Sequence, residues 1–394
     1  MKRAHRLDQV QPSLTLAITA KAAAMKAEGA DIVSFGAGEP DFSTPASVVE
    51  AAKRALDEGR TKYTPVAGLP ALRAGIAQWY GREFGVEVSS DEVIVGVGGK
   101  QVIYNALMSM IDPGDKVLIP APYWLSYPAM VHLCGGESVF VETQAADEFL
   151  VTPEALERAL TSSGASALIL NSPCNPTGQA YRAAQLTALA EVLRRHEDVV
   201  VIWDNIYAHL TYGGFRHTEL VSVAPDLRPR IVTTCGFSKS FSMTGWRLGF
   251  AIASAERIKA MTTIQSHSTS NATSFAQYGA LAALDLKHAD LESMRAKFER
   301  RRQVMLDGLS QVPGVSYVPP KGAFYVLVDC ASYFGGDDVA LAKHLLEEGH
   351  VATIPGAAFG APGCLRLSFA LDEASIRKGI ERIGQVLSRC EQTR

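Results

Sequence analysis

The residues with the clearest chemistry lie in the segment 235–250, CGFSKSFSMTGWRLGF. Its lysine, Lys239, lies among small and hydroxyl-bearing residues, with Ser238 and Ser240 on either side. An amine in an environment that disfavours its protonated form has a lowered pKa and becomes nucleophilic enough to form a Schiff base with a carbonyl group. We therefore take Lys239 as the candidate nucleophile.

Arg247 follows Lys239 by eight residues and offers a planar set of N–H donors that suits a phosphate group. A phosphate-binding arginine close to a Schiff-base lysine suggests pyridoxal phosphate as a cofactor. The alternative is a solvated loop lysine with an arginine on an edge strand. These residues alone leave both interpretations open.

Four apolar runs have the pattern of buried strands, and each is followed by a polar or aromatic residue that could contact a ligand. They are 116–120 before Trp124, 167–170 before Asn175, 199–203 before Asp204 and 231–234 before Lys239. The carboxyl ends of strands in an open α/β sheet meet at one crevice, where ligands bind. We therefore expect the four residues to lie close together, although Trp124 could instead be part of the core.

The segment 91–111 reads as a strand, a glycine turn and a helix that begins near GGKQ, residues 98–101. Unpaired backbone N–H groups and the helix dipole favour an anion at such a helix start. Gly98 and Gly99 allow close approach, and Gln101 can donate a hydrogen bond. Lys100 opposes the dipole by roughly 0.3–1 kcal/mol, which predicts a nearby anion, either phosphate or substrate carboxylate. A solvated side chain is the alternative.

The C-terminal part begins with a charged helical stretch, 285–309, and an alternating strand pattern follows a double proline. Further on, Arg366 lies between Leu365 and Leu367 in the strand-like segment CLRLSFA. An arginine with apolar neighbours in a strand is rarely buried without a carboxylate. That carboxylate can belong to a substrate or to a structural salt bridge.

Length and composition exclude several classes of protein. With 394 residues, 47% of them hydrophobic, the chain can fill the cores of two domains. A net charge of −3 gives no basic surface for nucleic acid. No apolar run has the length of a membrane span, and the polar N-terminus lacks a signal-peptide core, so we expect a cytoplasmic protein with small-molecule partners. Six cysteines without C-x-x-C or metal-ligand spacing indicate reduced thiols and no metal site.

The motif S-K-x-F-x-M-T-G-W-R-x-G-F at 238–250 resembles the cofactor-lysine motif of the class I pyridoxal phosphate-dependent aminotransferases. The resemblance extends from about Gln11 to the C-terminal helix and is closest to the bacterial aspartate aminotransferase branch. Further motifs of that branch occur in the expected order: GEPDF at 38–42, KYTP at 62–65, GGKQ at 98–101, NPTG at 175–178 and PGAAFG at 355–360.

The resemblance implies a role for each matched residue. Lys239 would carry the cofactor and move the substrate proton. Asp204 would pair with the protonated ring nitrogen, which makes the ring an electron sink, and Tyr207 would donate to the ring oxygen. Further cofactor contacts are implied for Gly99, Lys100, Gln101, Trp124, Asn175, Ser238, Arg247 and, across a homodimer, Tyr63.

Substrate contacts are implied in the same way. Arg366 would bind the α-carboxylate, and the backbone amide of Gly38 would meet the same group, with Trp124 and Asn175 close by. Because this branch lacks an arginine that its better-known relatives use, Lys100 is implied for a distal carboxylate. Ser13 and Thr15 would fold over that carboxylate. Two positions depart from the family pattern: Cys174, and Asn205, where a glutamate often follows the aspartate.

The implied fold is α/β, with a large domain, 41–290, built on a mostly parallel seven-stranded sheet covered by helices. A smaller α+β domain, 291–394, would be joined by the N-terminal segment 1–40. Both ends of the chain would therefore belong to the same domain.

The implied activity is ping-pong transamination between an amino acid, aspartate in this branch, and 2-oxoglutarate, with the small domain closing to exclude water. Prephenate, aromatic or neutral amino acids are alternative substrates. Other enzymes on this scaffold catalyse β-elimination, decarboxylation or ring closure. Regulators with such a domain need a DNA-binding module ahead of it; only a short segment precedes GEPDF, so we do not expect a regulator.

Overall fold

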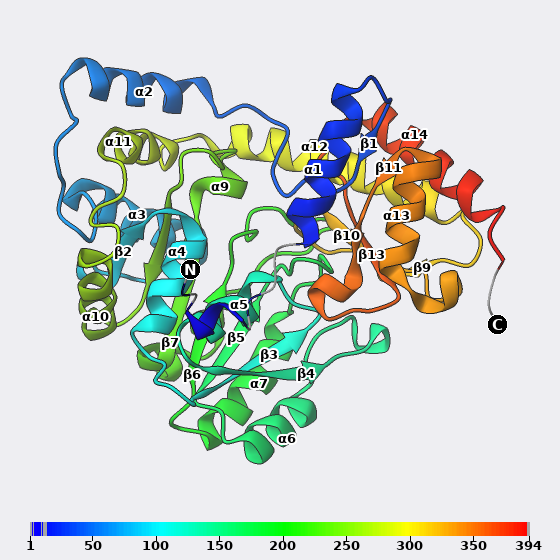
Figure 1. The fold of residues 1–394 in the computed structure, drawn as a ribbon. Helices are drawn as coiled ribbons and strands as arrows, with labels where there is room; N and C mark the ends of the chain where they lie inside the picture. The colour runs from blue at the N-terminus through cyan, green and yellow to red at the C-terminus, as the bar shows by residue number, and fades with distance from the viewer. Residues whose placement is uncertain (1, 3, 9, 11–13, 392–394) are drawn as a thin grey trace.

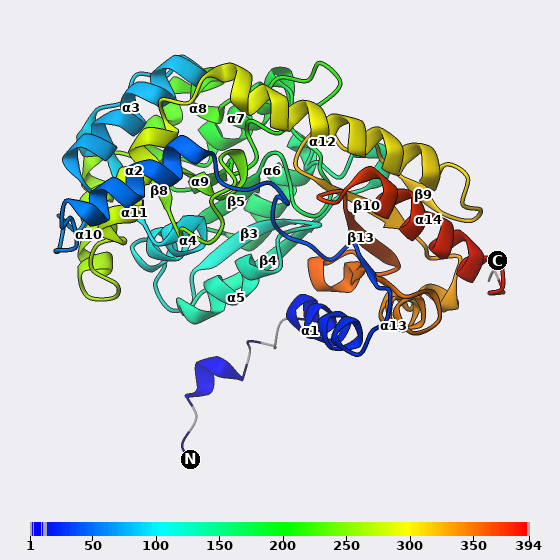
Figure 2. The same cartoon turned by 90° about the horizontal axis from the view of Figure 1, so that it is seen from above.

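The computed structural model describes residues 2, 4–8, 10 and 14–391. These residues form two lobes, and the long helix α12, His288–Leu309, runs from one to the other (Figures 1 and 2). One lobe contains a seven-stranded sheet, and the other contains a four-stranded and a two-stranded sheet. The predicted fold class is confirmed.

The large sheet has the strand order β2-β8-β7-β6-β5-β3-β4. Only β8 runs antiparallel to its neighbours, β2 and β7, while the other pairs are parallel. Its strands are β2 (Val93–Gly96), β3 (Lys116–Ala121), β4 (Glu137–Glu142), β5 (Ala167–Asn171), β6 (Val200–Asp204), β7 (Ile231–Gly236) and β8 (Gly249–Ile252). Because β5, β6 and β7 are adjacent and parallel, their carboxyl ends meet at one edge.

Helices cover both faces of this sheet because alternate strand residues point to opposite faces. Leu168 and Leu170 of β5 belong to an apolar cluster with α3, α6, α7 and α11, whereas Ala167 and Ile169 belong to another with α4, α5 and α10. The helices of this lobe are α2 (Ala46–Asp57), α3 (Pro70–Phe84), α4 (Gly98–Met108), α5 (Ser126–Leu133), α6 (Pro153–Ser163), α7 (Ala183–Arg195), α8 (Leu220–Val223), α9 (Phe237–Ser240), α10 (Ala255–Ser266) and α11 (Ser274–Ala283).

The second lobe combines the C-terminal part of the chain with residues 14–34, whereas the short helix His5–Leu7 near the N-terminus contacts α5 of the first lobe. Strand β1, Val33–Ser34, pairs in parallel with β11, Val351–Ala352. The four-stranded sheet is antiparallel, in the order β12-β13-β10-β9. The remaining elements are α1 (Leu14–Ala27), β9 (Ser316–Tyr317), β10 (Tyr325–Asp329), α13 (Asp338–Gly349), β12 (Ile354–Pro355), β13 (Cys364–Ser368) and α14 (Glu373–Leu387). Most of their apolar side chains form one core cluster, which also includes Tyr207, Leu210 and Tyr212 after β6, whereas Ala22 of α1 packs with Leu346 and Ala352 in a smaller cluster.

Helix boundaries follow local chemistry. Thr152 begins α6 by accepting a hydrogen bond from the Ala155 N–H, and Gly164, in the left-handed region, ends it. In the same way, Asp372 accepts from the Ser375 N–H at the start of α14. These signals are local and can be read from the sequence.

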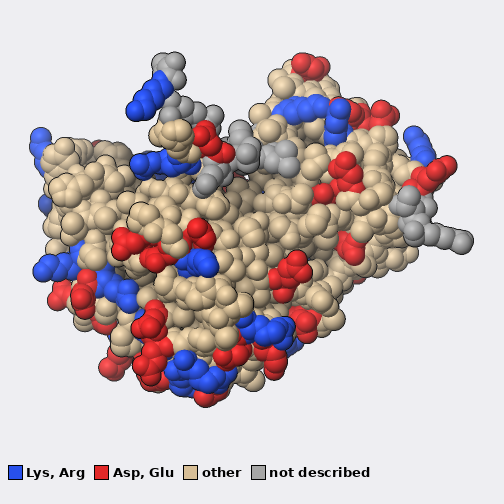
Figure 3. All heavy atoms as spheres, turned by 60° about the horizontal axis from the view of Figure 1, so that its bottom comes forward, with Lys and Arg blue, Asp and Glu red and all other residues tan. Residues whose placement is uncertain are grey.

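Surface features agree with the composition. On the face in Figure 3, basic and acidic side chains are interspersed, without an extended region of one sign. Within the described ranges, no helix is long and apolar enough to cross a membrane. No group of three or more His, Cys, Asp or Glu side chains among those residues is placed to hold a metal ion.

Candidate active site

Lys239 lies in the short helix α9, directly after β7. Its Nζ donates a hydrogen bond to the carbonyl oxygen of Gly38 at 2.5 Å and lies 5.8 Å from the centroid of the Phe324 ring. Gly38 comes from the GEPDF segment and Phe324 precedes β10. The lysine is therefore enclosed by segments that are far apart in the sequence.

The environment of Lys239 favours the neutral amine. Burial lowers its pKa from 10.5 to about 8. The carboxylate of Glu39 acts in the opposite direction, whereas the positive charges of Arg247 and Arg366 lower the pKa further. A larger neutral fraction near pH 7 is what a nucleophilic lysine or a lysine general base requires.

Asp204 ends β6 and is buried. Its Oδ2 accepts a hydrogen bond from the Tyr127 hydroxyl at 2.6 Å, and its Oδ1 accepts from the Ile206 N–H at 3.1 Å. Burial raises the pKa of Asp204 to about 6, although both hydrogen bonds oppose this. No basic side chain among the described residues forms an ion pair with it. The site thus holds a buried carboxyl group that lacks a cation.

Arg366 presents the opposite situation. It is 3% exposed and donates from Nη1 to Asn175 Oδ1 and from Nη2 to the Gly36 carbonyl, both at 3.1 Å. Its Nε has no hydrogen-bond partner, and no carboxylate of the described residues pairs with the guanidinium. Within the described part of the chain, the alternative of a structural salt bridge for Arg366 is therefore not found. A buried cation in this state is unfavourable unless an anion binds.

Tyr207 connects the regions around Asp204 and Arg366. Its hydroxyl lies 3.2 Å from that of Tyr325, and the Arg366 guanidinium lies 4.4 Å from the centroid of the Tyr325 ring. Burial raises the pKa of Tyr207 well above 10, so the hydroxyl keeps its proton and can donate. The two tyrosines and the arginine form one contiguous polar group.

Arg247 lies against the start of α4. A Cβ added to Gly98, which has a φ of +82°, would lie 2.6 Å from Arg247 Nη2, so only glycine fits there. Gly249 of β8 has no side chain and allows the Gly98–Gly99 backbone to approach. Arg247 Nη1 donates to the carbonyl oxygen of Thr244 at 3.0 Å. An arginine beside backbone N–H groups at a helix start is an arrangement that binds anions.

Lys100 and Trp124 lie close to each other. The Nζ of Lys100 is 5.0 Å from the centroid of the Trp124 ring, and that ring meets the Tyr127 ring edge-on at 5.3 Å. Desolvation and the nearby Arg247 lower the pKa of Lys100. No carboxylate of the described residues pairs with Lys100. The anion that the sequence predicts beside it would therefore have to come from a ligand.

Some predicted site residues are placed differently from expectation. The Gln101 side chain accepts from the Val97 N–H and donates to Thr269 Oγ1, both at 2.5 Å, so it stabilises the helix start. The Ser240 hydroxyl does not stay beside the lysine but lies 3.4 Å from His209 Nδ1. Ser238 is buried next to Lys239.

Three residues were predicted to reach the site from outside the crevice: Tyr63, Ser13 and Thr15. Tyr63 is 91% exposed. Thr15 lies at the start of α1, and Ser13 falls outside the described residues. Among the described residues, the site in a single chain therefore does not include Tyr63.

The sequence interpretation missed two aromatic hydroxyl groups. Tyr127 follows Trp124 by three residues, a spacing that weakly indicates that the two side chains lie on the same side of a helical turn. Tyr325 lies in a strand that was predicted, but the side of the strand that faces the site was not evident. Their contacts with Asp204 and Tyr207 became visible only in the folded chain.

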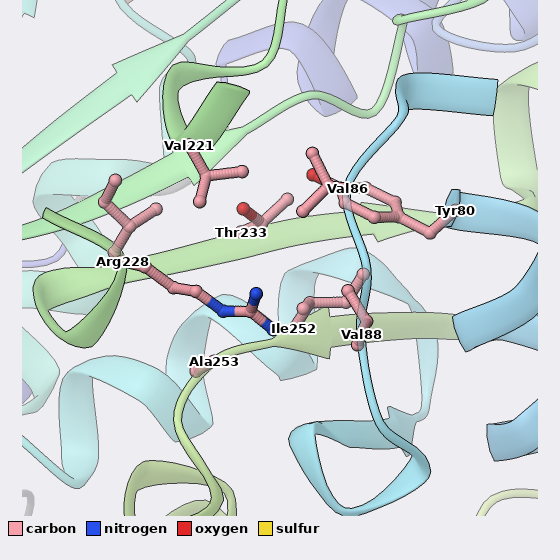
Figure 4. Close-up of a pocket in the computed structure, with 9 residues that line it drawn as sticks. Tyr80, Val86, Val88, Val221, Arg228, Thr233, Ile252 and Ala253 are labelled. Atoms are coloured by element: carbon pink, nitrogen blue, oxygen red, sulfur yellow. The ribbon is translucent and has the colours of Figure 1, made fainter. Parts of the chain in front are cut away.

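Two further cavities lie in the large lobe. The cavity in Figure 4 is lined mainly by apolar residues such as Val86, Val221 and Ile252, with Arg228 at one side. It also contacts Ile231, the first residue of β7, and so lies at the strand end opposite Lys239. The second cavity contains Cys174, and burial raises the pKa of this thiol to about 11. The thiol stays protonated near neutral pH and is a poor nucleophile.

Comparisons with known proteins agree with the fold. The family model for aminotransferase class I and II matches residues 30–383. An aspartate aminotransferase of Geobacillus stearothermophilus is 46% identical over 97% of this chain and 98% of its own. An aspartate/prephenate aminotransferase of Cereibacter sphaeroides is 46% identical over 96% of each chain.

Solved structures give the same result. The aspartate aminotransferase from Rhizobium meliloti has a TM-score of 0.95 and 40% identity, covering 99% of this chain and 100% of that one. The aspartate aminotransferase from Thermus thermophilus with maleate has a TM-score of 0.93 and 43% identity, covering 98% and 100%. Both the sheet order and the small lobe therefore have close counterparts among proteins of known structure.

Proposed function

Because the chain belongs to the class I and II aminotransferase family, we propose that it is a pyridoxal phosphate-dependent enzyme that transfers the amino group of aspartate to 2-oxoglutarate. The observation that supports this most strongly is a pair of buried charged groups without partners among the described residues: Asp204 has no cation and Arg366 has no anion. An amino acid held on a pyridine-containing cofactor supplies one group of each kind.

The chemistry of the donor set fits the cofactor. Arg247 and the N–H groups at the start of α4 suit its phosphate, and Asp204 suits its ring nitrogen. Tyr207 would donate to the ring oxygen together with Asn175, and Trp124 would provide an aromatic face for the ring. When bound, pyridoxal phosphate supplies an electron-withdrawing ring that stabilises negative charge on the substrate α-carbon.

The protein residues supply binding and proton transfer. Arg366 holds the substrate α-carboxylate with two parallel N–H donors, which fixes the orientation of the α-carbon. The Nζ of Lys239 takes the proton from the α-carbon of the amino donor in one half-reaction and delivers a proton to the α-carbon of the oxo acid in the other, and a pKa of about 8 suits such a general acid and base near neutral pH. Gly38 contacts the same lysine through its carbonyl oxygen and would present its N–H to the substrate carboxylate.

The choice of aspartate depends on Lys100. This cation lies beside Trp124 and has no carboxylate partner among the described residues, so it suits a distal substrate carboxylate. Relatives named as aspartate aminotransferases and a neighbour whose structure contains maleate, a dicarboxylate, support this reading. Several relatives at 43–46% identity are named aspartate/prephenate aminotransferases, so prephenate is a second candidate acceptor.

The same proposal includes the domain division. Residues 41–290 would form the cofactor-binding domain, and 291–394 with the segment 1–40 would form the small domain. Helix α12 supports this boundary, because Leu291 packs on a core cluster of the large sheet whereas Phe298 belongs to the core of the small lobe.

We also propose a homodimer with shared sites. Tyr63, at 91% exposure, is a large aromatic side chain that its own chain leaves almost entirely uncovered. Tyr63 of one subunit would reach the phosphate group bound by the other. An isolated subunit would then lack one phosphate contact.

A donor and acceptor screen tests the proposal. Purified protein with pyridoxal phosphate would be assayed with aspartate, alanine and phenylalanine as donors and with 2-oxoglutarate and prephenate as acceptors. Oxo-acid formation that requires an acceptor supports transamination, whereas ammonia release without one would indicate a lyase. A neutral or aromatic donor preferred over aspartate would contradict the proposed specificity.

The cofactor assignment needs a separate measurement. Borohydride reduction followed by peptide mass spectrometry should locate the cofactor on Lys239. Lys239→Ala should lose both this label and turnover. Label on another lysine, or full turnover in the variant, would refute the assignment.

A further inference from the structure

A single buried carboxylate, that of Glu219, accepts hydrogen bonds from both sequence neighbours of Asp204. Trp203 Nε1 donates to its Oε2 at 2.8 Å, and Asn205 Nδ2 donates to its Oε1 at 2.5 Å. Glu219 is 1% exposed and directly precedes α8. The carboxylate thus connects the residues on both sides of Asp204.

The contacts of Glu219 lie on the other face of the large sheet from the Asp204 side chain. Trp203 belongs to the apolar cluster with α3, α6 and α7, whereas Tyr127, the partner of Asp204, belongs to the cluster with α4, α5 and α10. This follows from the alternation of side chains along a strand. Glu219 therefore does not contact Asp204 directly, and the backbone of β6 connects the two residues.

A third potential donor lies beside the same carboxylate. His217 Nε2 lies 3.0 Å from Glu219 Oε1, and its ring stacks on the Trp203 ring with centroids 6.0 Å apart. Burying a carboxylate is unfavourable unless it receives several hydrogen bonds, and this one has three potential donors. Neither Glu219 nor His217 contacts the residues assigned to the cofactor or the substrate, so the proposed reaction does not explain why they are buried here.

The identity of residue 205 fits this arrangement. Asn205, noted above as a departure from the family pattern, provides the N–H donor that Glu219 requires. A glutamate at 205 would place a second carboxylate against Glu219. Two further hydrogen bonds hold the backbone around Asp204. Asn171 Nδ2 donates to the Asp204 carbonyl oxygen, and the Asn205 N–H donates to the carbonyl oxygen of Thr234.

We propose that Glu219 is a positioning residue for Asp204. By accepting hydrogen bonds from Trp203 and Asn205, it fixes the carboxyl end of β6 so that the Asp204 carboxylate meets the ring nitrogen of the cofactor. The inference rests on the proposed function, because it concerns that nitrogen. Glu219 touches neither the substrate nor the cofactor and acts through Asp204.

The test replaces Glu219 with an apolar side chain of similar length. Glu219→Met leaves the Trp203 and Asn205 donors without an acceptor, which should loosen the end of β6. A displacement of a catalytic group by about 1 Å can lower a rate by roughly a hundredfold, so kcat should fall by roughly tenfold to a hundredfold while KM for the donor stays within about twofold. The pH midpoint of the visible absorbance of the bound cofactor should also shift.

Two further variants at this group distinguish positioning from bulk packing. Glu219→Gln can keep both hydrogen bonds if the amide of Asn205 reverses, since the Asn205 Oδ1 has no partner now, so it should restore kcat and the absorbance midpoint. Trp203→Phe removes one donor and should give a smaller shift in the same direction. It also serves as the test if Glu219→Met does not fold.

A matched control removes a buried hydrogen bond elsewhere. Tyr333→Phe in the small lobe loses the bond from Tyr333 Oη to the Pro313 carbonyl, 2.6 Å long. It should lower Tm without changing kcat or the absorbance midpoint. If Glu219→Met behaves in the same way, with a lower Tm and an unchanged kcat and midpoint, the inference is overturned.

A measurement without cofactor separates this inference from the proposed function. The indole N–H resonance of Trp203, assigned in cofactor-free protein by its loss in Trp203→Phe, should move in Glu219→Met and stay in Glu219→Gln; an unmoved resonance in Glu219→Met overturns the inference. A wild-type protein that gains no visible absorbance with pyridoxal phosphate would overturn the proposed function and this inference with it. If the wild type binds the cofactor and Glu219→Met equals the wild type in every measurement, the inference about Glu219 is overturned but the proposed function is not.

Discussion

Asp204→Asn should stabilise the cofactor-free protein while it impairs the enzyme. In the folded chain, burial raises the pKa of Asp204 from its ordinary value of 3.8 to about 6. The unfolded chain therefore ionises this group at lower pH than the folded chain does. Its contribution to stability is greatest below pH 3.8, declines as the pH rises to about 6, and is least above that value.

The size of the effect follows from the same numbers. Each tenfold change in ionisation corresponds to about 1.4 kcal/mol, so the difference between 3.8 and about 6 amounts to about 3 kcal/mol at pH 7 and above. An asparagine carries no charge and can keep both contacts, accepting from the Ile206 N–H and donating to the Tyr127 oxygen. We expect the cofactor-free variant to gain up to about 3 kcal/mol at pH 8 and little at pH 4.

The assay is urea unfolding of cofactor-free wild type and variant between pH 4 and pH 8. Asp198→Asn, an exposed change of the same charge, is the control and should show no such pH dependence. In the presence of pyridoxal phosphate, kcat of Asp204→Asn should be roughly tenfold to a hundredfold lower than that of the wild type, because a hydrogen bond to a charged group contributes about 1.5–3 kcal/mol. A variant that is less stable than wild type at pH 8, or equally stabilised at pH 4, would refute the reasoning.

Four further predictions follow from the site. The rate at which cofactor-free protein attaches pyridoxal phosphate, followed by absorbance, should rise about tenfold per pH unit and level off near pH 8, because only neutral Lys239 reacts; a rise continuing to pH 10 would contradict the lowered pKa. Arg366→Gln should raise KM for aspartate by roughly tenfold to a hundredfold in steady-state assays, and an unchanged KM would exclude its role with the α-carboxylate. Lys100→Ala should lower kcat/KM roughly tenfold to a hundredfold more for aspartate than for alanine, whereas an equal loss would place Lys100 on the cofactor phosphate. Mixing Tyr63→Phe with Lys239→Ala subunits should restore part of the activity through hybrid dimers, and a fully active monomer in ultracentrifugation would rule out shared sites.

The sequence, with the family resemblance that it carries, predicted the fold class, and its apolar runs predicted the strands that precede the candidate site residues. The apolar runs that precede Asn175, Asp204 and Lys239 form the adjacent strands β5, β6 and β7, and short apolar runs between turn residues are typical of strands in a sheet covered on both faces. The position of Arg366 within its strand also predicted its burial correctly. These features depend on local periodicity, which one sequence contains in full.

Contacts across segments were harder to predict. Nothing near Gly38 in the sequence indicates that its carbonyl oxygen accepts a hydrogen bond from Lys239, 201 residues later. Likewise, the spacing around Gln101 could not show that its amide is bound to Thr269. Such contacts depend on how separate elements pack, which local patterns do not encode.

By itself, the sequence determined which residues can do chemistry and which strands deliver them, because residue type and periodicity are local properties. Only the tertiary structure decided which buried charges lack a partner. Arg366 could have faced a structural carboxylate and Asp204 a structural cation, and the fold supplies neither among the described residues. The tertiary structure also brought Trp203, Asn205 and Glu219 into hydrogen-bond contact. Whether a polar group is satisfied depends on the whole three-dimensional environment, because each potential partner comes from a different element of the fold.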